Sequence, residues 1–419
     1  MKSRYNWGVV KKKRRLIDVW LCVLMILSVN FFELRPITGV LGPDGGYTFF
    51  LITLFILFTF YRRKHIREYI SWMNPFWWFM IGIILSFIPA LIYYGQGFGR
   101  SCLANRHMLF FCAFPVFIAI RPTEREIRSA LYAFSVIYLG VVLLVSFVNT
   151  NLIPVPEHSF FINNEGSDYV LTVQGFRYVV LALIMSLDRL MHKFSNKNLF
   201  WFFFLFGIIF LVQNRTALLT AVVVSLFAIW DMKMSARKLL LMVVIFTAGL
   251  FLVAMTASQW GLLYDETITQ LSDPDYNRIK SMNYMFAHRD GFIRYILGDG
   301  FISGVVNPIM QRLAQEGIYH SDVGLFGTWH QYGLIPVITI LVCCIKGLAS
   351  KKSFISKAIA IYILLGAATL SYFGLAETLM LLAFFQYMYN TDRIGELHDN
   401  AYDPVKRKAK WGRYRSLTR

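Results

Sequence analysis

Long apolar runs recur along the whole chain, each about 15 to 23 residues long, and a helix needs about 20 apolar residues to cross a bilayer core. We count twelve runs, whose centres lie near Leu24, Leu54, Ile84, Phe114, Leu139, Leu181, Phe206, Val223, Ile245, Val337, Leu364 and Leu382. With 57% hydrophobic residues and a mean hydropathy of +0.52, the 419-residue chain is too apolar for a water-soluble domain. The sequence therefore predicts an all-α polytopic membrane protein with about twelve transmembrane helices.

Basic residues are distributed unevenly between alternate connections of these runs. If the amino terminus lies in the cytoplasm, seven segments on that side hold 32 of the 42 lysines and arginines. These segments are residues 1–15, 61–71, 121–128, 188–197, 231–238, 346–357 and 391–419. Such a bias orients a membrane bundle. The formal net charge of +18 therefore reflects topology and anionic lipid headgroups, and we expect no nucleic-acid partner.

This topology divides the chain into five parts and places both termini in the cytoplasm. The parts are a basic N-terminus (1–15), helices 1 to 9 (16–256), one large outer loop (257–321), helices 10 to 12 (322–390) and a basic tail (391–419). The five cysteines form neither a disulfide framework nor a metal-ligand pattern. We therefore expect no metal and no other cofactor.

The stretch LFWFFFLFGIIFLVQNRTALLTAVVVSLFAIW, residues 199–230, holds an arginine among some thirty apolar residues. One helix of that length would measure about 50 Å, against about 30 Å for a hydrocarbon core. Lys197 and Lys233 flank the stretch and place both of its ends on the cytoplasmic side. The stretch therefore predicts two helices that turn at QNRT near the outer face, with Arg215 in an outward-open cavity. An intramembrane charge costs about 2 to 3.5 kcal/mol, so Arg215 is either functional or snorkels to the outer headgroups.

The large outer loop contains two helical patterns and a glycine-rich turn. The helical patterns run from Tyr276 to His288 and from Ile309 to Gln315. Between them, LGDGFISG places Gly298 and Gly300 in a turn that lets the backbone approach a ligand or pack tightly. The turn follows no predicted strand and precedes no phosphate-binding lysine, which argues against a nucleotide-binding loop.

Several arginines lie in outer loops or at their edges and offer positive charge to an anion; they are Arg100, Arg106, Arg177, Arg278, Arg289 and Arg294. Asp273 and Asp275 flank Pro274, a pattern that favours a loop turn over a divalent-ion site. Where the chain re-enters the membrane, His320 or Asp322 can act as a general base, although Asp322 can equally cap the next helix.

Several segments, taken in order, resemble the O-antigen polymerase and O-antigen ligase family. QNRTALLTA (Gln213–Ala221) is similar to the family's SRTA turn. Arg278 followed by LGDGF (Leu297–Phe301) is similar to the family's outer-loop pattern of an arginine and then a glycine turn. The spacing from Arg289 to Gly300 is similar to the arginine-to-glycine spacing in the outer loops of the polymerases. HSDVGLFGTWHQYGLIPVI resembles a signature of the family in which a polar residue opens a helix and a glycine–leucine pair follows. In this chain the pair is Gly333 and Leu334. The resemblance covers most of the chain.

The resemblance implies a GT-C type glycosyltransferase of the bacterial inner membrane with its active site facing the periplasm. The donor would be a glycan on undecaprenyl pyrophosphate and the acceptor the terminal sugar of another lipid-linked repeat, with membrane lipids and a chain-length regulator protein as further partners. Arginine binds phosphate bidentately, so we assign Arg215 and Arg278 to the pyrophosphate and Arg289 as a second choice. Gly298 and Gly300 would form the supporting turn, and no metal would be needed.

The proton acceptor stays open between three residues. The ligases place a histidine where the helix after the outer loop opens; eleven residues before Gly333 this chain has Asp322, and His320 lies two residues earlier. This departure favours a polymerase over a ligase. Glu377, the only acid of the last outer loop, is either a base or an arginine partner. We interpret His330, inside the tenth predicted span, as a hydrogen-bonded packing residue.

Two other functions remain as alternatives. One is an O-antigen ligase that transfers the glycan to lipid A–core. The other is a flippase for lipid-linked oligosaccharides or another transporter, which should show repeat symmetry and charged residues near the midplane. Here the outer cations concentrate in loops, and one loop is far larger than the rest, which favours the glycosyltransferase.

Overall fold

The computed structural model describes residues 16–42, 45–62, 72–145, 152, 173–212, 215–231, 277–287, 291–302, 312, 313, 315, 316, 318, 323–350, 353–367 and 376–393. All regular elements in these ranges are helices. Helices occupy eleven of the twelve predicted runs, and the run near Ile245 lies outside the described residues. The prediction of an all-α chain is therefore confirmed for the part that the structure describes.

Among the described residues, fewer helices are long and apolar enough to cross a membrane than the twelve that we predicted. By length and composition, Asn74–Tyr94 and Glu124–Leu143 can each cross a membrane, and two bent helix pairs raise the number to four. Shorter apolar helices cover Ile17–Ser28, Asn196–Val212, Ala217–Ala228, Leu334–Leu348 and Phe354–Ala367. Many apolar runs thus fold into helices shorter than the roughly 20 residues of a straight span.

The first part of the chain, up to the eighth predicted run, contributes most of the helices. They are α1 (Ile17–Ser28), the short η1 (Asn30–Glu33), α2 (Arg35–Leu41), α3 (Gly45–Tyr61), α4 (Asn74–Leu85), α5 (Phe87–Tyr94), α6 (Phe98–Ala104), η3 (Arg106–Cys112), α7 (Ala113–Ile120), α8 (Glu124–Leu143), α9 (Phe176–His192), α10 (Asn196–Val212) and α11 (Arg215–Asp231). A capping box in which Thr123 and Glu126 exchange hydrogen bonds starts α8.

The remaining described helices are α14 (Asn277–Ala287), α15 (Phe292–Leu297), α17 (Gly324–Tyr332), α18 (Leu334–Leu348), α19 (Phe354–Ala367) and α20 (Ala376–Arg393). Helix α14 confirms the first predicted helix of the outer loop to within a residue at each end. The second, Ile309–Gln315, lies mostly outside the described residues. Helix α15 was not predicted as a helix, because its six residues are too few to show a period.

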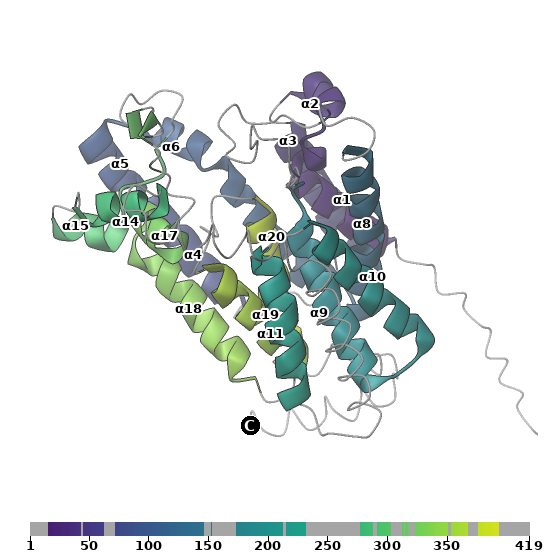
Figure 1. Ribbon diagram of the computed structural model, residues 1–419. Coiled ribbons are helices and arrows are strands. Elements are labelled where there is room, and N and C mark those ends of the chain that lie inside the picture. Colours follow the sequence, from purple (N-terminus) through teal and green to yellow (C-terminus); the bar gives the residue numbers. More distant parts are fainter. Residues whose placement is uncertain are drawn as a thin grey trace, which may run out of the picture.

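The apolar stretch around Arg215 forms two helices, as the flanking lysines predict. Helix α10 ends at Val212 and α11 begins at Arg215, and each is 17 residues long. Both pack against α9 (Figure 1). The residues between them, Gln213 and Asn214, lie outside the described part of the chain.

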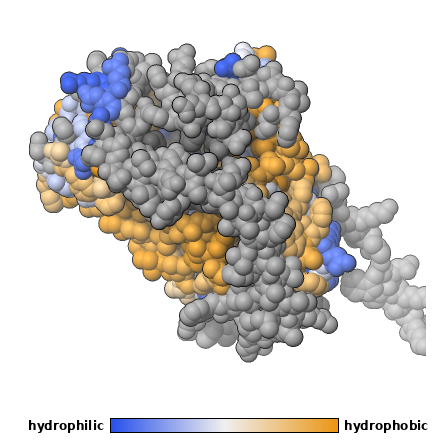
Figure 2. Space-filling model, viewed as in Figure 1, coloured by the Kyte–Doolittle hydropathy of each residue, from blue (hydrophilic) through white to orange (hydrophobic). Residues whose placement is uncertain are grey.

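Helix α9 is the centre of the bundle. Every residue from Phe176 to Leu187 is buried, since α9 is surrounded by α8, α10, α11, α19 and α20. Figure 1 shows α4 and α18 on the left of this core and α1, α8 and α10 on the right. A helix that is buried on every side lies in the interior of a bundle. The flanks are different, because large apolar side chains are exposed there and form a broad apolar surface (Figure 2).

The predicted tenth span is interrupted. Gly333, with φ of +78°, separates α17 from α18. A residue with a side chain is strained at such an angle, so the break coincides with glycine. Val323 occupies the N-cap position of α17, and Asp322, which we considered as a cap for this helix, lies outside the described residues.

Candidate functional site

Two backbone segments from different parts of the chain meet at the end of the bundle formed by α5, α15 and α17. The amide of Asp299 donates to the carbonyl of His330 at 2.7 Å, and the amide of Gly300 donates to the carbonyl of Gln331 at 2.8 Å. The predicted glycine-rich turn of the outer loop therefore lies directly against the end of α17.

Glycine is required at three positions of this contact. Gly298, Gly300 and Gly333 have φ of +76°, +80° and +78°. A Cβ on Gly298 would lie 2.5 Å from the amide nitrogen of Gly333, and a Cβ on Gly333 would lie 2.1 Å from the carbonyl oxygen of Ile296. Because the opposing atoms belong to the backbone, neither contact can relax by a side-chain rotation. The prediction that Gly298 and Gly300 permit tight packing is confirmed.

Asp299, between the two glycines, is the centre of a polar cluster that we call the Asp299 clamp and that comprises Asp299, Tyr94, Arg294 and His330. Arg294 donates from Nε to Oδ1 at 2.7 Å and from Nη2 to Oδ2 at 2.6 Å. The hydroxyl of Tyr94 donates to Oδ2 at 2.7 Å, and Nε2 of His330 lies 3.5 Å from the same oxygen. The clamp joins α5, α15 and α17 through one buried carboxylate.

The charges of the clamp stabilise each other. Burial raises the pKa of the Asp299 carboxyl, but the hydrogen bonds from Arg294 and Tyr94 and the charges of His330 and Arg294 outweigh it and hold that pKa below its usual value. The hydrogen bond to Asp299 raises the pKa of Arg294. The guanidinium also lies 4.9 Å from the ring centroid of Tyr93. Asp299 is therefore an anion at neutral pH, and both of its carboxylate oxygens already accept hydrogen bonds from neighbouring side chains.

A small pocket opens beside the clamp. Its lining residues are Tyr94, Tyr284, Asp299, Gly300, Ile302, Leu313, His330 and Gln331. Our interpretation of His330 as a packing residue agrees with its 3% exposure, and the structure adds its position next to Asp299. Sequence reasoning missed the clamp, although the aspartate enclosed by two glycines in LGDGF was a signal that could have pointed to it.

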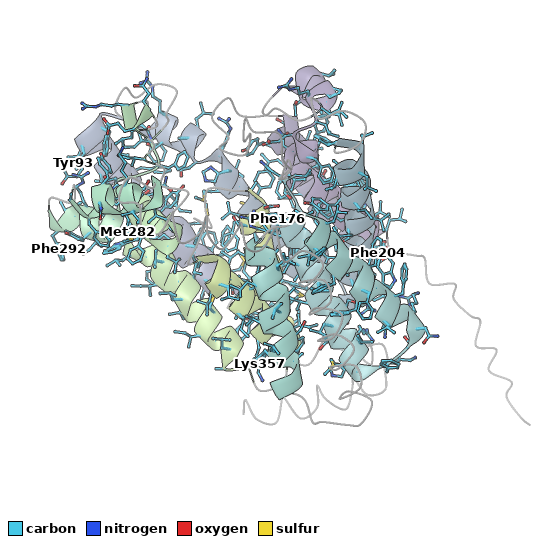
Figure 3. All side chains as sticks on the ribbon, viewed as in Figure 1. Tyr93, Phe176, Phe204, Met282, Phe292 and Lys357 are labelled. Carbon is cyan, nitrogen blue, oxygen red and sulfur yellow. The ribbon has the colours of Figure 1, made fainter. Side chains whose placement is uncertain are left out.

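A second buried ion pair lies in the middle of the bundle. Arg177, in the first turn of α9, pairs with Glu377, in the first turn of α20. The guanidinium also lies 4.8 Å from the ring centroid of Phe176, which Figure 3 labels near the centre of the molecule, away from Tyr93 at its edge. Of the two roles considered for Glu377, the structure shows the arginine partner. Oε2 of Glu377 has no hydrogen-bond partner among the described residues.

The other predicted site residues are only partly described. Arg215 is the first residue of α11 and Arg278 lies in the first turn of α14, while their side chains lie outside the description. Arg289, His320 and Asp322 lie outside the described residues, as do Asp273 and Asp275. Of the predicted residues, the structure places Gly298 and Gly300 against the segment that ends at Gly333.

Comparison with known proteins gives no family for this chain. No protein-family model matches it, and no curated protein matches it.

Proposed function

We propose that this chain is a membrane glycosyltransferase of the polymerase type, which transfers a glycan from undecaprenyl pyrophosphate to the terminal sugar of another lipid-linked repeat at the periplasmic face of the inner membrane. One observation carries the proposal: the glycine turn around Asp299 packs backbone to backbone against the segment that ends at Gly333. These are two of the segments that resemble the O-antigen polymerase and ligase family, and no local pattern required them to meet.

The proposed reaction is a displacement at the anomeric carbon. The oxygen of the acceptor hydroxyl forms the new bond to that carbon while the bond to the pyrophosphate oxygen breaks. The electron pair of the broken bond leaves with the lipid pyrophosphate, and the hydroxyl proton passes to a protein base. Negative charge grows on the leaving group, so fixed cations stabilise the transition state. In this proposal Arg215 and Arg278 bind the pyrophosphate, with Arg289 as the second choice.

The position of Arg215 supports this role. It stands at the start of α11, after a break between two apolar helices. Backbone amides at a helix N-terminus also favour an anion, so a phosphate at this end would meet both kinds of positive group.

The proton acceptor is one of Asp322, His320 and Glu377. Glu377 is the one whose side chain the structure describes; the side chain is buried, and its Oε2 has no hydrogen-bond partner among the described residues. Its Oε1 is already paired with Arg177. We therefore keep Asp322 and His320 beside it.

Transfer between lipid-linked repeats by the purified protein, without nucleotide or added metal, tests the function. Arg215→Ala should abolish growth of the product chain, and Arg215→Lys should restore only part of it, because lysine lacks the bidentate fork. Arg312→Ala is the control for loss of an arginine charge elsewhere, since Arg312 lies in the large outer loop, where its side chain is 80% exposed and pairs with Glu316. Unchanged product length with folded Arg215→Ala would overturn the assignment of Arg215.

The base is found by comparing three variants in the same assay. We expect one of Asp322→Asn, His320→Gln and Glu377→Gln to lower the transfer rate by about 10²- to 10⁴-fold, the usual contribution of general base catalysis. The other two should lower it by less than about tenfold. If none of the three variants reaches a hundredfold loss, the base lies elsewhere.

In cells, the polymerase and its closest alternative give different products. Loss of a polymerase leaves single repeats attached to the outer lipid, whereas loss of a ligase leaves no attached glycan. Single attached repeats in a deletion strain would support the proposal, and absent glycan would favour the ligase.

A further inference from the structure

Large apolar side chains are exposed on the short helices beside the Asp299 clamp. We call this set the apolar flank, and its members are Met282 and Phe286 on α14, Phe292 and Ile293 on α15, and Phe326 on α17. Phe292 is 78% exposed and Phe286 is 50% exposed. The rings of Phe286 and Phe326 meet edge to face at 5.6 Å, so the flank continues from one helix to the next. A contiguous exposed apolar surface marks an interaction site.

The contacts of the Asp299 clamp hold the apolar flank at one end of a helix that can span the membrane. Asn74–Tyr94, which comprises α4 and α5, is one of the helices long and apolar enough to cross a membrane. Arg294 of α15 contacts the last two residues of that span: its guanidinium lies over the ring of Tyr93, and its Nη2 donates to the hydroxyl of Tyr94 at 3.0 Å. Helix α15 therefore lies at the level where the span ends, which is where tyrosines meet the bilayer–water interface.

The apolar flank also continues an exposed apolar surface along the span. Ile84, Ile88, Leu91 and Ile92 are exposed on α4 and α5, and the neighbouring α18 exposes Ile338, Val342 and Ile345. Figure 3 shows Tyr93, Met282 and Phe292 together at the left edge of the molecule, and Figure 2 shows the orange surface of the bundle reaching that edge.

We propose that α14, α15 and the start of α17 enter the bilayer interface with the apolar flank, so that acyl chains of the lipid cover it. In α14 the side that packs on the protein and the exposed side are distinct, because Ser281 and Met285 are buried while Met282 and Phe286 are exposed. Amphipathic helices of this kind lie about 5 to 10 Å deep at the headgroup boundary. A bilayer fits better than a second copy of the chain, since the flank is continuous with the exposed side of a span.

This placement has a consequence for the pocket beside the clamp. Since Tyr94 and Asp299 line the pocket and also belong to the clamp, the pocket lies at headgroup level, where the polar head of a lipid-linked molecule would be found. The inference does not depend on the proposed glycosyl transfer, and its test measures no activity.

Site-directed spin labelling of the full chain in lipid nanodiscs tests the inference. In a Cys102→Ser background, which removes the exposed native cysteine, labels are attached at Phe292→Cys and separately at Ile293→Cys. Ile88→Cys, on the exposed side of the span, serves as the lipid control, and Arg312→Cys serves as the water control. Collision rates with oxygen, which concentrates in lipid, and with a water-soluble nickel chelate are then compared.

We expect both flank labels to collide more with oxygen than with nickel, as at Ile88, and the reverse at Arg312. Nickel-dominated collisions at Phe292 and Ile293 would overturn the inference and leave the flank in water. Protection of both labels from both reagents would also overturn it, in favour of a second copy of the chain. Because Phe292 and Ile293 are exposed and lie outside the clamp, the labels report on placement without breaking the contacts that fix α15.

Discussion

Two buried arginine–carboxylate pairs in the described part of the chain, Arg294–Asp299 and Arg177–Glu377, differ in how completely the carboxylate is bonded. Asp299 accepts two hydrogen bonds from Arg294 and one from Tyr94, and His330 lies beside it. Glu377 pairs with Arg177 through Oε1, while Oε2 has no hydrogen-bond partner among the described residues. A fully bonded buried carboxylate stabilises one arrangement of its neighbours, whereas an incompletely bonded one can accept a further donor. The Asp299 clamp is therefore architectural, and Glu377 remains a candidate for chemistry.

The largest expected effect comes from breaking the clamp. Asp299→Ala leaves the Arg294 guanidinium and the Tyr94 hydroxyl without their acceptor, and we expect the free energy of unfolding to fall by about 3 to 5 kcal/mol. Reversible unfolding in detergent, followed by circular dichroism, measures this loss. The double variant Arg294→Met with Asp299→Met removes both charges and should recover most of the stability. A loss below about 1 kcal/mol for Asp299→Ala would show that the clamp is not architectural.

Isosteric amides sharpen the comparison between the two pairs. Asp299→Asn replaces an oxygen that accepts hydrogen bonds by a nitrogen that cannot, and each such bond to a charged group contributes about 1.5 to 3 kcal/mol. Glu377→Gln can keep its one oxygen on Arg177, so its cost in the same unfolding measurement should be smaller. Equal costs at both positions would mean that Glu377 is bonded as completely as Asp299.

A substitution in the glycine turn should have an effect of intermediate size on the free energy of unfolding. Gly298→Ala forces a side chain onto a residue with φ of +76° and brings its Cβ against the backbone of Gly333 and Gln331. We expect the free energy of unfolding to fall by about 1 to 3 kcal/mol. Gly207→Ala on α10 is the matched control, because its Cβ would meet nothing within 4 Å. That variant should be neutral or slightly stabilising, since alanine favours a helix.

The smallest effect is a dependence on pH. The folded pKa of Asp299 lies below its unfolded value, which is about 3.9, so the carboxylate stabilises the protein fully above about pH 5. This contribution should disappear as the pH falls through the lowered folded pKa. The difference in unfolding free energy between the parent and Asp299→Asn, measured from pH 7 to pH 3, should be constant at first and then shrink. A difference that grows as the pH falls would contradict the direction of the shift.

Helical content and several boundaries were predictable because they depend on local sequence. Lys197 and Lys233 flank a run too long for one span, which was enough to predict the break between α10 and α11. The period of apolar residues predicted α14. These signals come from hydrogen bonds and side-chain spacing within a few turns of one helix, so they need no knowledge of the rest of the chain.

The candidate site was predictable only in its glycines. The LGDGF sequence indicates a turn, and the positive φ of Gly298 and Gly300 agrees with it. The tenth span was wrong as one helix, since Gly333 interrupts it. A glycine within a helical pattern is a weak signal by itself, and here a contact with the backbone at Ile296 decides its conformation.

The amino-acid sequence by itself determined an apolar helical chain, the positions of many helices and the turns that need glycine, because these follow from local propensity and from the cost of placing polar groups in lipid. Tertiary structure alone decided which polar side chains meet. Tyr94 and Asp299 are 205 residues apart, and Arg177 and Glu377 lie on helices on opposite sides of the outer loop in the sequence. Such pairs are specified by how helices pack, and packing sums many small contacts that no short motif records.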